Sequence, residues 1–341
     1  MARAKANPRN RFATEQLEYE EVEGPSALVE VARDSSRSIL SRNDSPDLGF
    51  KWSVNPYRGC FHGCAYCYAR PSHEYLGLGA GTDFERKLTI KPEAPALLRA
   101  AFDRPSWKGQ LVLFSGVTDC YQPLEAEHEL TRGCLEVCAE YRNPVGIVTK
   151  STLVTRDIDL LCRLRDEASV TVSMSIPVFE TDRARAVEPY VPSPVRRLKV
   201  IERLAEAGIE VCLNVAPVIP GLSEHGLEGL LRTAADAGAA RAWYTLLRLP
   251  GAVAPVFEGA LRERLPLTAD KTLARIREAR GGRINDPRFH TRMTGEGAYA
   301  RTFALLFERL LEKHGLTRRE VFEMPKSFRR PTPQLSLFSL D

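Results

Sequence analysis

The chain has 341 residues, of which 43% are hydrophobic, and a formal net charge of +4 at pH 7. This length is enough for one large domain or for a barrel with extensions. No stretch approaches eighteen consecutive apolar residues, which excludes a membrane-spanning helix, and the basic start lacks the apolar segment of a signal peptide. The eight cysteines form no secretory framework and indicate a reducing compartment, so we expect a cytoplasmic protein.

Residues 1–49 are polar, charged and weakly periodic, which predicts an extended N-terminal arm that is partly disordered at its start. In residues 50–250, short apolar runs alternate with amphipathic helical stretches, a pattern typical of βα units around a parallel sheet. We expect one strand just before Cys60 and further strands at 111–114, 145–148, 170–174, 209–215 and 241–247. The predicted helices between them are 125–141, 156–166, 193–207 and 224–236.

Local signals mark one of these helices clearly. Ser193 is predicted as its N-cap, Pro194 as its first residue, and Gly208 as its stop. After Pro250, two more helical stretches, 268–280 and 297–313, predict a C-terminal helical extension over 251–330, followed by a tail at 331–341. The core therefore contains about six βα units.

The most informative motif is a run of three cysteines, Cys60, Cys64 and Cys67, with the spacing C-x3-C-x2-C. Three thiolates within eight residues can converge on one metal centre, and the neighbouring glycines Gly59 and Gly63 allow a tight loop. A [4Fe–4S] cluster with three cysteine ligands keeps one iron atom without a protein ligand, and that iron can bind a small molecule.

A zinc site is the alternative for this loop. His62 or His73 would then be the fourth ligand. Zinc fingers and ribbons normally have a second pair of cysteines or histidines at a regular spacing, and no such pair follows here.

The spacing C-x3-C-x-aromatic-C resembles the signature of the radical S-adenosylmethionine (SAM) superfamily. In that family the open iron chelates SAM, and the reduced cluster splits SAM into methionine and a 5′-deoxyadenosyl radical that abstracts hydrogen from a substrate. The resemblance implies a [4Fe–4S] cluster on Cys60, Cys64 and Cys67, SAM as the second cofactor, and Tyr66 near the adenine. It also implies an α/β fold, a partial (β/α)6 TIM-like barrel with the cysteine loop at the rim.

Polar residues at the predicted strand ends are candidates for cofactor contacts, because the carboxyl ends of parallel strands converge at one rim. Ser115, Gly116, Thr118 and Asp119 follow the second strand, where relatives often carry a Gly-Gly-Glu segment that this chain lacks. The alternative for these residues is an ordinary turn that caps the next helix.

Lys150 and Ser151 follow the third strand in a Thr-Lys-Ser run, similar to one that helps hold SAM in relatives of spore photoproduct lyase. A lysine inside a barrel is costly to bury without an anionic partner. Ser173 and Ser175 follow on one face of the fourth strand and suit ribose hydroxyls.

Two further candidates complete the rim. Ile219 lies in a segment that resembles the apolar adenine contact of the superfamily, and Arg248 at the last strand end is a candidate for the SAM carboxylate or the substrate. A surface salt bridge is the alternative for Arg248.

The wider pattern is similar to a bacterial subfamily resembling spore photoproduct lyase, over about residues 35–330. The matching segments include 37–40, 43–46, 55–60, 67–71, 156–159 and 292–295. Spore photoproduct lyase returns a hydrogen atom through a protein thiol, and Cys120, with Tyr121 beside it, is the catalytic candidate in the corresponding region. Cys134, Cys138, Cys162 and Cys212 are assigned to core packing.

Two functions follow. The first is a radical SAM enzyme with a reductase partner such as flavodoxin or ferredoxin, an unknown substrate for which a DNA lesion is one candidate, and no membrane partner. The second is a non-catalytic iron–sulfur or zinc protein that binds nucleic acid. Six arginines are candidates for phosphate contacts in either case: Arg183, Arg185, Arg196, Arg197, Arg329 and Arg330.

Overall fold

The computed structural model describes residues 7–8, 10–12, 28–318 and 326–331. Its central feature is an eight-stranded sheet with the order β11-β10-β9-β8-β7-β6-β3-β2. Six strands form one continuous parallel series: β3 (Trp52–Val54), β6 (Val112–Phe114), β7 (Val145–Thr149), β8 (Val170–Ser175), β9 (Glu210–Val218) and β10 (Arg241–Leu246). At the edges, β2 (Leu40–Arg42) runs antiparallel to β3 and the short β11 (Thr317–Arg318) parallel to β10. The predicted partial (β/α)6 barrel is confirmed.

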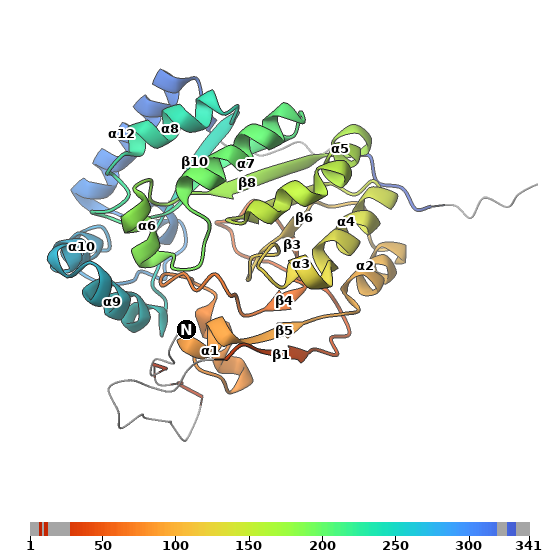
Figure 1. Ribbon diagram of the computed structural model, residues 1–341, viewed down its shortest axis with the longest axis horizontal. Coiled ribbons are helices and arrows are strands. Elements are labelled where there is room, and N and C mark those ends of the chain that lie inside the picture. Colours follow the sequence, from red (N-terminus) through yellow and green to blue (C-terminus); the bar gives the residue numbers. More distant parts are fainter. Residues whose placement is uncertain (1–6, 9, 13–27, 319–325, 332–341) are drawn as a thin grey trace, which may run out of the picture.

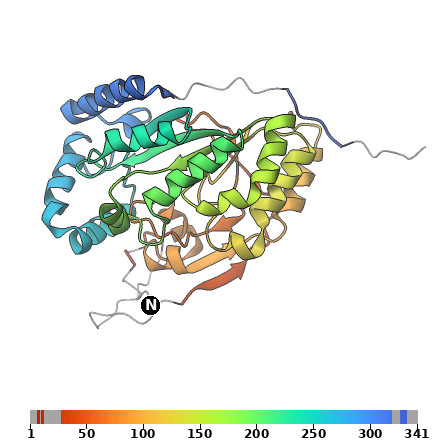
Figure 2. The same cartoon turned by 45° about the horizontal axis from the view of Figure 1, so that its top comes forward.

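Helices connect the parallel strands and cover one face of the sheet (Figure 1, Figure 2). The crossover helices are α2 (Ala94–Asp103), α3 (Glu125–His128), α4 (Leu130–Glu140), α5 (Ile158–Glu167), α6 (Thr181–Val187), α7 (Pro194–Glu206) and α8 (Leu227–Asp236). A short α1 (Thr82–Arg86) precedes them, and α9 (Val253–Arg264), α10 (Pro266–Glu278), α11 (Thr291–Thr294) and α12 (Gly297–His314) follow β10. In the described part of the chain, no helix combines the length and the apolar character that crossing a membrane would need.

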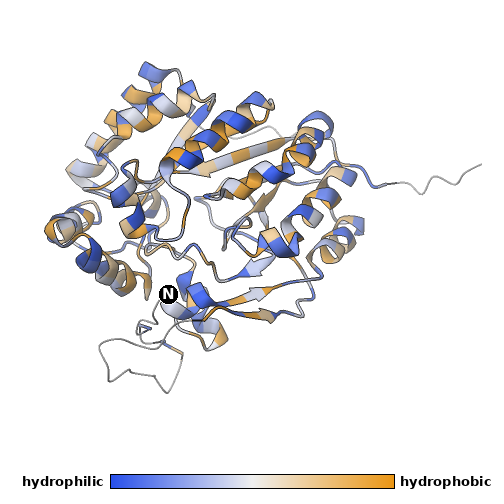
Figure 3. Cartoon of the chain, viewed as in Figure 1, coloured by the Kyte–Doolittle hydropathy of each residue, from blue (hydrophilic) through white to orange (hydrophobic). Residues whose placement is uncertain are grey.

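The main core lies between the sheet and these helices, and Figure 3 shows apolar residues along the central strands. β6 is buried at every position, as expected for a parallel strand covered on both faces. In α7, Leu198, Ile201 and Leu204 recur at helical spacing and are all buried. The predicted start of α7 is confirmed, since the Ser193 side chain accepts a hydrogen bond from the Arg196 N–H.

The single predicted helix over 125–141 is wrong. Glu129 has a left-handed conformation, with φ +48°, and separates α3 from α4. The cause is a tertiary contact: the Glu125 carboxylate turns back to accept the N–H groups of Thr131 at 2.8 Å and Arg132 at 3.1 Å. A carboxylate at this point satisfies free donors in the first turn of α4 and interacts favourably with its helix dipole.

The two predicted helical stretches after Pro250 correspond to α10 and α12, but the prediction missed α9. Its signal was present, because Val253, Phe257 and Leu261 recur every four residues and are all buried. The Pro255 within the first turn of this helix is tolerated because N–H groups there have no helical partner. The crossover helices α2 and α6 were also not predicted.

A second, three-stranded sheet lies beside the first. β1 (Glu30–Arg33) runs parallel to β5 (Lys87–Ile90), and β4 (Tyr57–Arg58) runs antiparallel to β5. Within the predicted arm of residues 1–49, the described part contributes β1 to this sheet and β2 to the large one. The predicted disorder at the start of the arm, and the predicted tail, fall almost entirely on residues outside the described ranges.

The connection between β2 and β3 contacts the segment that contains α11. The Asp47 side chain is 1% exposed, accepts the His290 N–H at 2.6 Å and forms an ion pair with Arg292. Arg292 also donates to the Ser45 hydroxyl. Since α11 packs against β10, these contacts join the region of one sheet edge to that of the other. The open side of the partial barrel is thus bridged by loops instead of by strands.

Replacing Asp47 by Asn is expected to destabilise the protein by about 2 kcal/mol, because a charged acceptor of two hydrogen bonds is lost. Burial disfavours the carboxylate, yet the His290 N–H and Arg292 outweigh it and lower the pKa of Asp47. A lowered pKa contributes stability above the unfolded-state value of about 3.9, and this contribution is lost as the pH falls through the folded-state value. The difference between wild type and D47N in urea unfolding should therefore be constant above about pH 5 and shrink below about pH 4.

D44N is the matched control, since Asp44 lies in the same connection and its side chain is 75% exposed in an ion pair with Arg42. An exposed pair of this kind contributes little. Equal unfolding free energies for D47N and D44N would contradict a role of Asp47 in bridging the barrel.

Candidate functional site

The three motif cysteines lie in the loop of residues 59–68, which follows β3 of the large sheet and β4 of the small one. The loop begins at Gly59 with φ +70°, where a Cβ would lie 2.8 Å from Leu88 Cδ2 and 2.9 Å from the Phe84 carbonyl oxygen. The same carbonyl accepts the Cys60 N–H at 3.0 Å. Only glycine permits this close approach and this backbone conformation together.

The cysteine side chains point into the protein. Cys60 and Cys64 are buried, and Cys67 is half-buried. Burial raises the pKa of the Cys67 thiol, and the neighbouring Cys60 raises it further, so these two groups are close. Among the described residues, no three His, Cys, Asp or Glu side chains are grouped tightly enough to hold a single metal ion. A [4Fe–4S] cluster does not need such a group, since each cysteine ligates a different iron atom.

Arg70, which the sequence analysis did not assign to the site, holds the cysteine loop in shape. Its side chain is fully buried and donates to the carbonyl groups of Cys64 at 3.0 Å and Gly63 at 3.2 Å. It also donates to two carbonyls of the segment before α1 and to the Glu85 carboxylate at 2.6 Å. A planar guanidinium with five N–H groups is suited to hold several carbonyls at once.

Asp119 positions the turn that carries Lys150. Its carboxylate accepts the Thr149 hydroxyl at 2.7 Å and the Lys150 N–H at 2.8 Å, and it lies 3.4 Å from His62 Nδ1. Burial acts against this charge, but His62 and the donors lower the pKa of Asp119 to about 2. Protein donors engage both oxygens of Asp119 in positioning this turn, and its contact with a cofactor stays a prediction.

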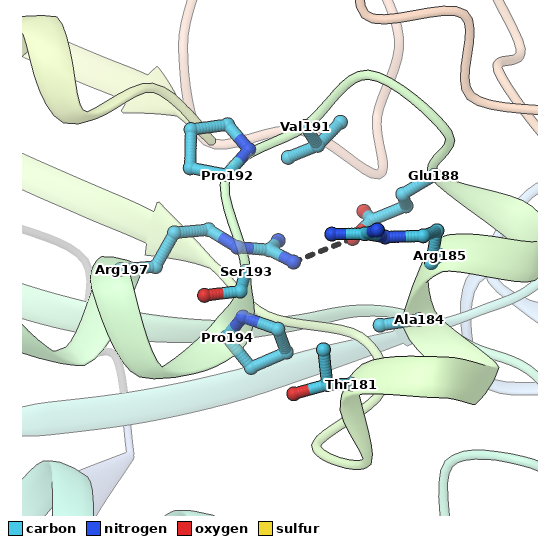
Figure 4. A pocket seen from close by; sticks show the side chains of 9 residues that line it. All are labelled: Thr181, Ala184, Arg185, Glu188, Val191, Pro192, Ser193, Pro194 and Arg197. Atoms are coloured by element: carbon cyan, nitrogen blue, oxygen red, sulfur yellow. Dashed lines mark hydrogen bonds and ion pairs between the residues drawn. The ribbon is translucent and has the colours of Figure 1, made fainter.

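The Lys150 ammonium lies 5.7 Å from the centre of the Tyr66 ring, on the cysteine loop. Burial disfavours its charge, but Cys64, Glu188 and Asp119 raise its pKa, so Lys150 is a cation. The Tyr66 hydroxyl in turn donates to the buried Glu188 carboxylate, which pairs with Arg197 (Figure 4). Glu188 and Arg197 were likewise not assigned to the site from the sequence.

The segment after β6 uses its polar groups within the protein. Ser115 has φ +75°, and its hydroxyl accepts the Cys120 N–H at 2.8 Å. Thr118 donates to a carbonyl of β4 at 3.0 Å. The Gly116 carbonyl accepts the Tyr68 hydroxyl at 2.7 Å, which connects this segment to the cysteine loop. Ser115 and Thr118 therefore have the turn-forming role that was the alternative to cofactor binding, and the Gly116 carbonyl is occupied.

The serines at the next two strand ends differ in what they contact. Ser151 caps a 3-10 turn by accepting the Leu153 N–H at 3.2 Å, so it has a structural role instead of the predicted cofactor contact. Ser173 and Ser175 are both buried on β8. The Ser175 hydroxyl accepts from the Asn214 amide at 3.3 Å, which leaves the hydroxyl proton to bond a further group.

Ile219 and Arg248 each lie near a tyrosine of the cysteine loop, Ile219 near Tyr66 and Arg248 near Tyr68. Ile219 is buried in the same hydrophobic cluster as Tyr66. The half-buried Arg248 contacts Met293 Sδ at 3.8 Å, a weak acceptor. Burial, together with the nearby Arg292, lowers its pKa, and Tyr68 opposes this effect. No carboxylate lies within 4 Å of Arg248 in the described part of the chain, so the alternative of a surface salt bridge does not hold there, and its contact with SAM or substrate stays a prediction.

The prediction of Cys120 and Tyr121 as catalytic residues is not supported by their positions. Cys120 has no exposed surface and belongs to the main hydrophobic core, where burial strongly raises its pKa. The Tyr121 hydroxyl donates to Asp157 at 3.0 Å within a buried network of ionised side chains. A thiol that exchanges hydrogen with a substrate must be reachable, and Cys120 is covered on all sides.

The two histidines proposed as zinc ligands differ, since His62 is paired with Asp119 whereas His73 Nδ1 has no hydrogen-bond partner among the described residues. His73 Nε2 lies 3.0 Å from the Lys87 carbonyl oxygen, and its ring packs edge-on against Phe84. The buried His62 lies beside Asp119, and although burial opposes its charge, Cys60 and Asp119 raise its pKa to about 10. A protonated imidazole has no lone pair for a metal.

Comparisons with known proteins identify the family. Residues 54–234, more than half of the chain, match the family described as the radical SAM superfamily. The chain therefore belongs to the radical SAM superfamily, whose cofactors are a [4Fe–4S] cluster and SAM.

Uncharacterized proteins of two mycobacteria, Mycobacterium tuberculosis and Mycobacterium bovis, are 40% identical over 194 residues. This match covers 56% of the chain and 57% of each relative, so the chain spans little more than half the length of these relatives. An uncharacterized protein of Methanocaldococcus jannaschii is 30% identical over 58% of the chain and 71% of its own length.

Among solved structures, spore photoproduct lyase complexed with dinucleoside spore photoproduct is similar, with a TM-score of 0.61 and 17% identity. The similarity covers 84% of this chain and 81% of that chain. A variant of the same lyase with bound AdoMet and dinucleoside spore photoproduct gives a TM-score of 0.57 at 17% identity. At this identity the likeness shows a shared fold.

The residues present fit both cofactors. Three neighbouring thiols in a buried loop are the donor set that a [4Fe–4S] cluster requires. Lys150 adds a cation beside that loop, which suits the carboxylate of an amino-acid cofactor.

Proposed function

We propose that this protein is an enzyme that binds a [4Fe–4S] cluster at Cys60, Cys64 and Cys67 and SAM beside it. The observation that carries the proposal is the position of Lys150, a cation over the Tyr66 ring and close to Cys64. In the described residues its ammonium has no carboxylate within 4 Å, which leaves it able to pair with a ligand. When bound, these cofactors supply a 5′-deoxyadenosyl radical for hydrogen abstraction from a substrate.

In this proposal each residue of the site has the role that its chemical group allows. The three thiolates ligate the cluster, and Lys150 pairs with the carboxylate of SAM. The Tyr66 ring supplies an apolar surface for the adenine, and the fully buried Ile219 supports it from within the same hydrophobic cluster. Arg248, with only a sulfur contact for its Nη1 group, faces the substrate side. The cluster has to receive an electron, so a reductase such as flavodoxin or ferredoxin is the proposed partner.

We do not extend the proposal to a DNA lesion as the substrate. Of the arginines considered for phosphates, Arg197 is buried against Glu188, and Arg183 pairs with Glu180 at 2.7 Å. Arg330 donates to three backbone carbonyls. The alternative of a non-catalytic zinc protein is disfavoured because His62 is paired with Asp119 and no second pair of cysteines or histidines follows the motif at a regular spacing.

The test is anaerobic reconstitution of the purified protein with iron and sulfide, followed by reduction. We expect an EPR signal of a reduced [4Fe–4S] cluster that changes when SAM is added, and 5′-deoxyadenosine in the same sample. Zinc reconstitution in parallel is the control. A cluster that is indifferent to SAM, or a protein that binds zinc in preference to iron, would contradict the proposal and favour a structural metal site.

A further inference from the structure

A chain of buried contacts runs from the cysteine loop to the end of β8. The Tyr66 hydroxyl donates to one oxygen of Glu188, and Arg197 Nη2 donates to the other at 2.6 Å. Arg197 Nη1 donates to the Ser175 carbonyl at 2.6 Å. One carboxylate and one guanidinium thus connect the residue next to Cys67 with a strand end that faces the proposed SAM site.

These two charges are unusually well buried. Glu188 is 2% exposed and Arg197 1% exposed. Figure 4 shows the two side chains in contact, and both line a small pocket between α6 and the start of α7. Because both side chains are almost fully buried, the pair is not placed to contact a cofactor or substrate directly.

Burying such a pair is costly, and apolar residues of similar volume are often at least as stable. The pair instead fixes the orientation of the side chains that it contacts. Arg197, which donates to the Ser175 carbonyl, fixes the orientation of the Glu188 carboxylate that accepts the Tyr66 hydroxyl. This hydrogen bond restrains the Tyr66 ring beside Lys150, whose ammonium lies 5.7 Å from the ring centre.

Glu188 also supplies charge. Lys150 forms no contact ion pair among the described residues, and Glu188 is one of the anions near enough to favour its charged form. The negative charge on Glu188 is itself compensated by Arg197 at contact distance. The ammonium therefore keeps its charge and stays available for a ligand carboxylate.

We propose that Glu188 and Arg197 are positioning residues for SAM: they hold the Tyr66 ring and the charged Lys150 in the arrangement that binds the cofactor. The inference rests on the proposed function. It assigns these two residues no contact with SAM and no part in holding the cluster.

The structure contains a matched control. Tyr57 donates to the buried Glu125, which pairs with Arg156 at 2.6 Å, so a second Tyr–Glu–Arg chain exists in the same protein. Its partners are α4 and the 3-10 turn Thr152–Asp157. Y57F and Y66F each remove one hydroxyl from a buried carboxylate, and only the second lies beside Lys150.

The experiment compares reconstituted wild type, Y66F, E188Q and Y57F by iron content, by SAM dissociation constant and by the SAM-induced EPR change. For Y66F and E188Q we expect wild-type iron content and a SAM dissociation constant raised about tenfold, the worth of one hydrogen bond to a charged group. For Y57F we expect SAM binding within about twofold of wild type, although its urea stability falls as much as that of Y66F. If E188Q does not fold, the comparison of Y66F with Y57F alone tests the inference.

Each alternative result has one meaning. Unchanged SAM affinity in Y66F and E188Q, or an equal loss in Y57F, would overturn the inference. Loss of iron in Y66F would overturn it too, because the chain of contacts would then hold the cluster loop. If the wild-type protein itself showed no response to SAM, the proposed function would be wrong. The wild-type sample alone distinguishes this failure from a failure of the inference about Glu188 and Arg197.

Discussion

Replacing Cys60, Cys64 and Cys67 together by alanine is expected to reduce iron content after reconstitution to background. Formation of 5′-deoxyadenosine from SAM should fall to background with it. The reason is that thiolates are the ligands of such clusters, and no other group of His, Cys, Asp or Glu side chains in the described residues is arranged to hold a metal. Iron and sulfide analysis and quantification of 5′-deoxyadenosine measure the two effects.

The control is C162A, since Cys162 is half-buried on α5 and its Sγ donates to the Ala207 carbonyl, at 3.6 Å. This variant should retain iron and SAM cleavage. Iron retained at the wild-type level by the triple variant would show that the cluster lies elsewhere and would remove the basis of the proposed function.

Replacing Arg70 by Leu is expected to have the second largest effect. The substitution removes one donor from each of four backbone carbonyl groups and the partner of the Glu85 carboxylate, and the Cys64 carbonyl keeps only the Cys67 N–H at 3.2 Å. The loss should be on the order of 3 kcal/mol, because several buried hydrogen bonds are lost together. Since two of these carbonyls belong to Gly63 and Cys64, the cluster should also be lost faster from the folded protein.

The R70K variant tests whether Arg70 acts through the planar shape of its guanidinium or through its positive charge alone. Lysine keeps the positive charge near Glu85 but cannot hold four carbonyls in one plane, so we expect R70K to lose iron nearly as fast as R70L. R99L is the surface control, because Arg99 is 44% exposed in its pair with Glu140. Urea unfolding and the rate of iron release to a chelator measure both effects. Wild-type iron retention in R70K would mean that charge alone accounts for Arg70.

Much of the fold follows from local pattern. The strands of the parallel sheet after β3 were predicted to within a few residues, since each is a short apolar run between helical stretches. Ser193 and Pro194 marked the start of α7 because capping depends on neighbours in the chain. The break between α3 and α4 was missed because the Glu125 side chain, held by Tyr57 and Arg156 from other parts of the chain, decides it.

The functional site likewise has residues that the sequence predicted and residues whose role depends on contacts in the folded chain. Lys150 and the cysteines were identified from spacing and from their place at strand ends. Thr118 and Ser151 have polar side chains at the same rim, yet their hydroxyl groups bond nearby backbone groups. Cys120 was expected at the substrate and lies in the core. The position of a residue at a strand end predicts that it lies at the rim of the barrel. The direction of its side chain depends on the conformation of the local turn.

The sequence by itself indicated the cofactor chemistry of this protein, because the spacing of Cys60, Cys64 and Cys67 and the aromatic Tyr66 before the third cysteine resemble the radical SAM signature. The tertiary structure alone decided how that loop is held. Arg70 reaches carbonyl groups in two segments, and Glu188 meets Tyr66 across 122 positions of the chain. Such partners are chosen by packing at long sequence separation, and the residues near Glu188 in the sequence carry no sign of the tyrosine it binds.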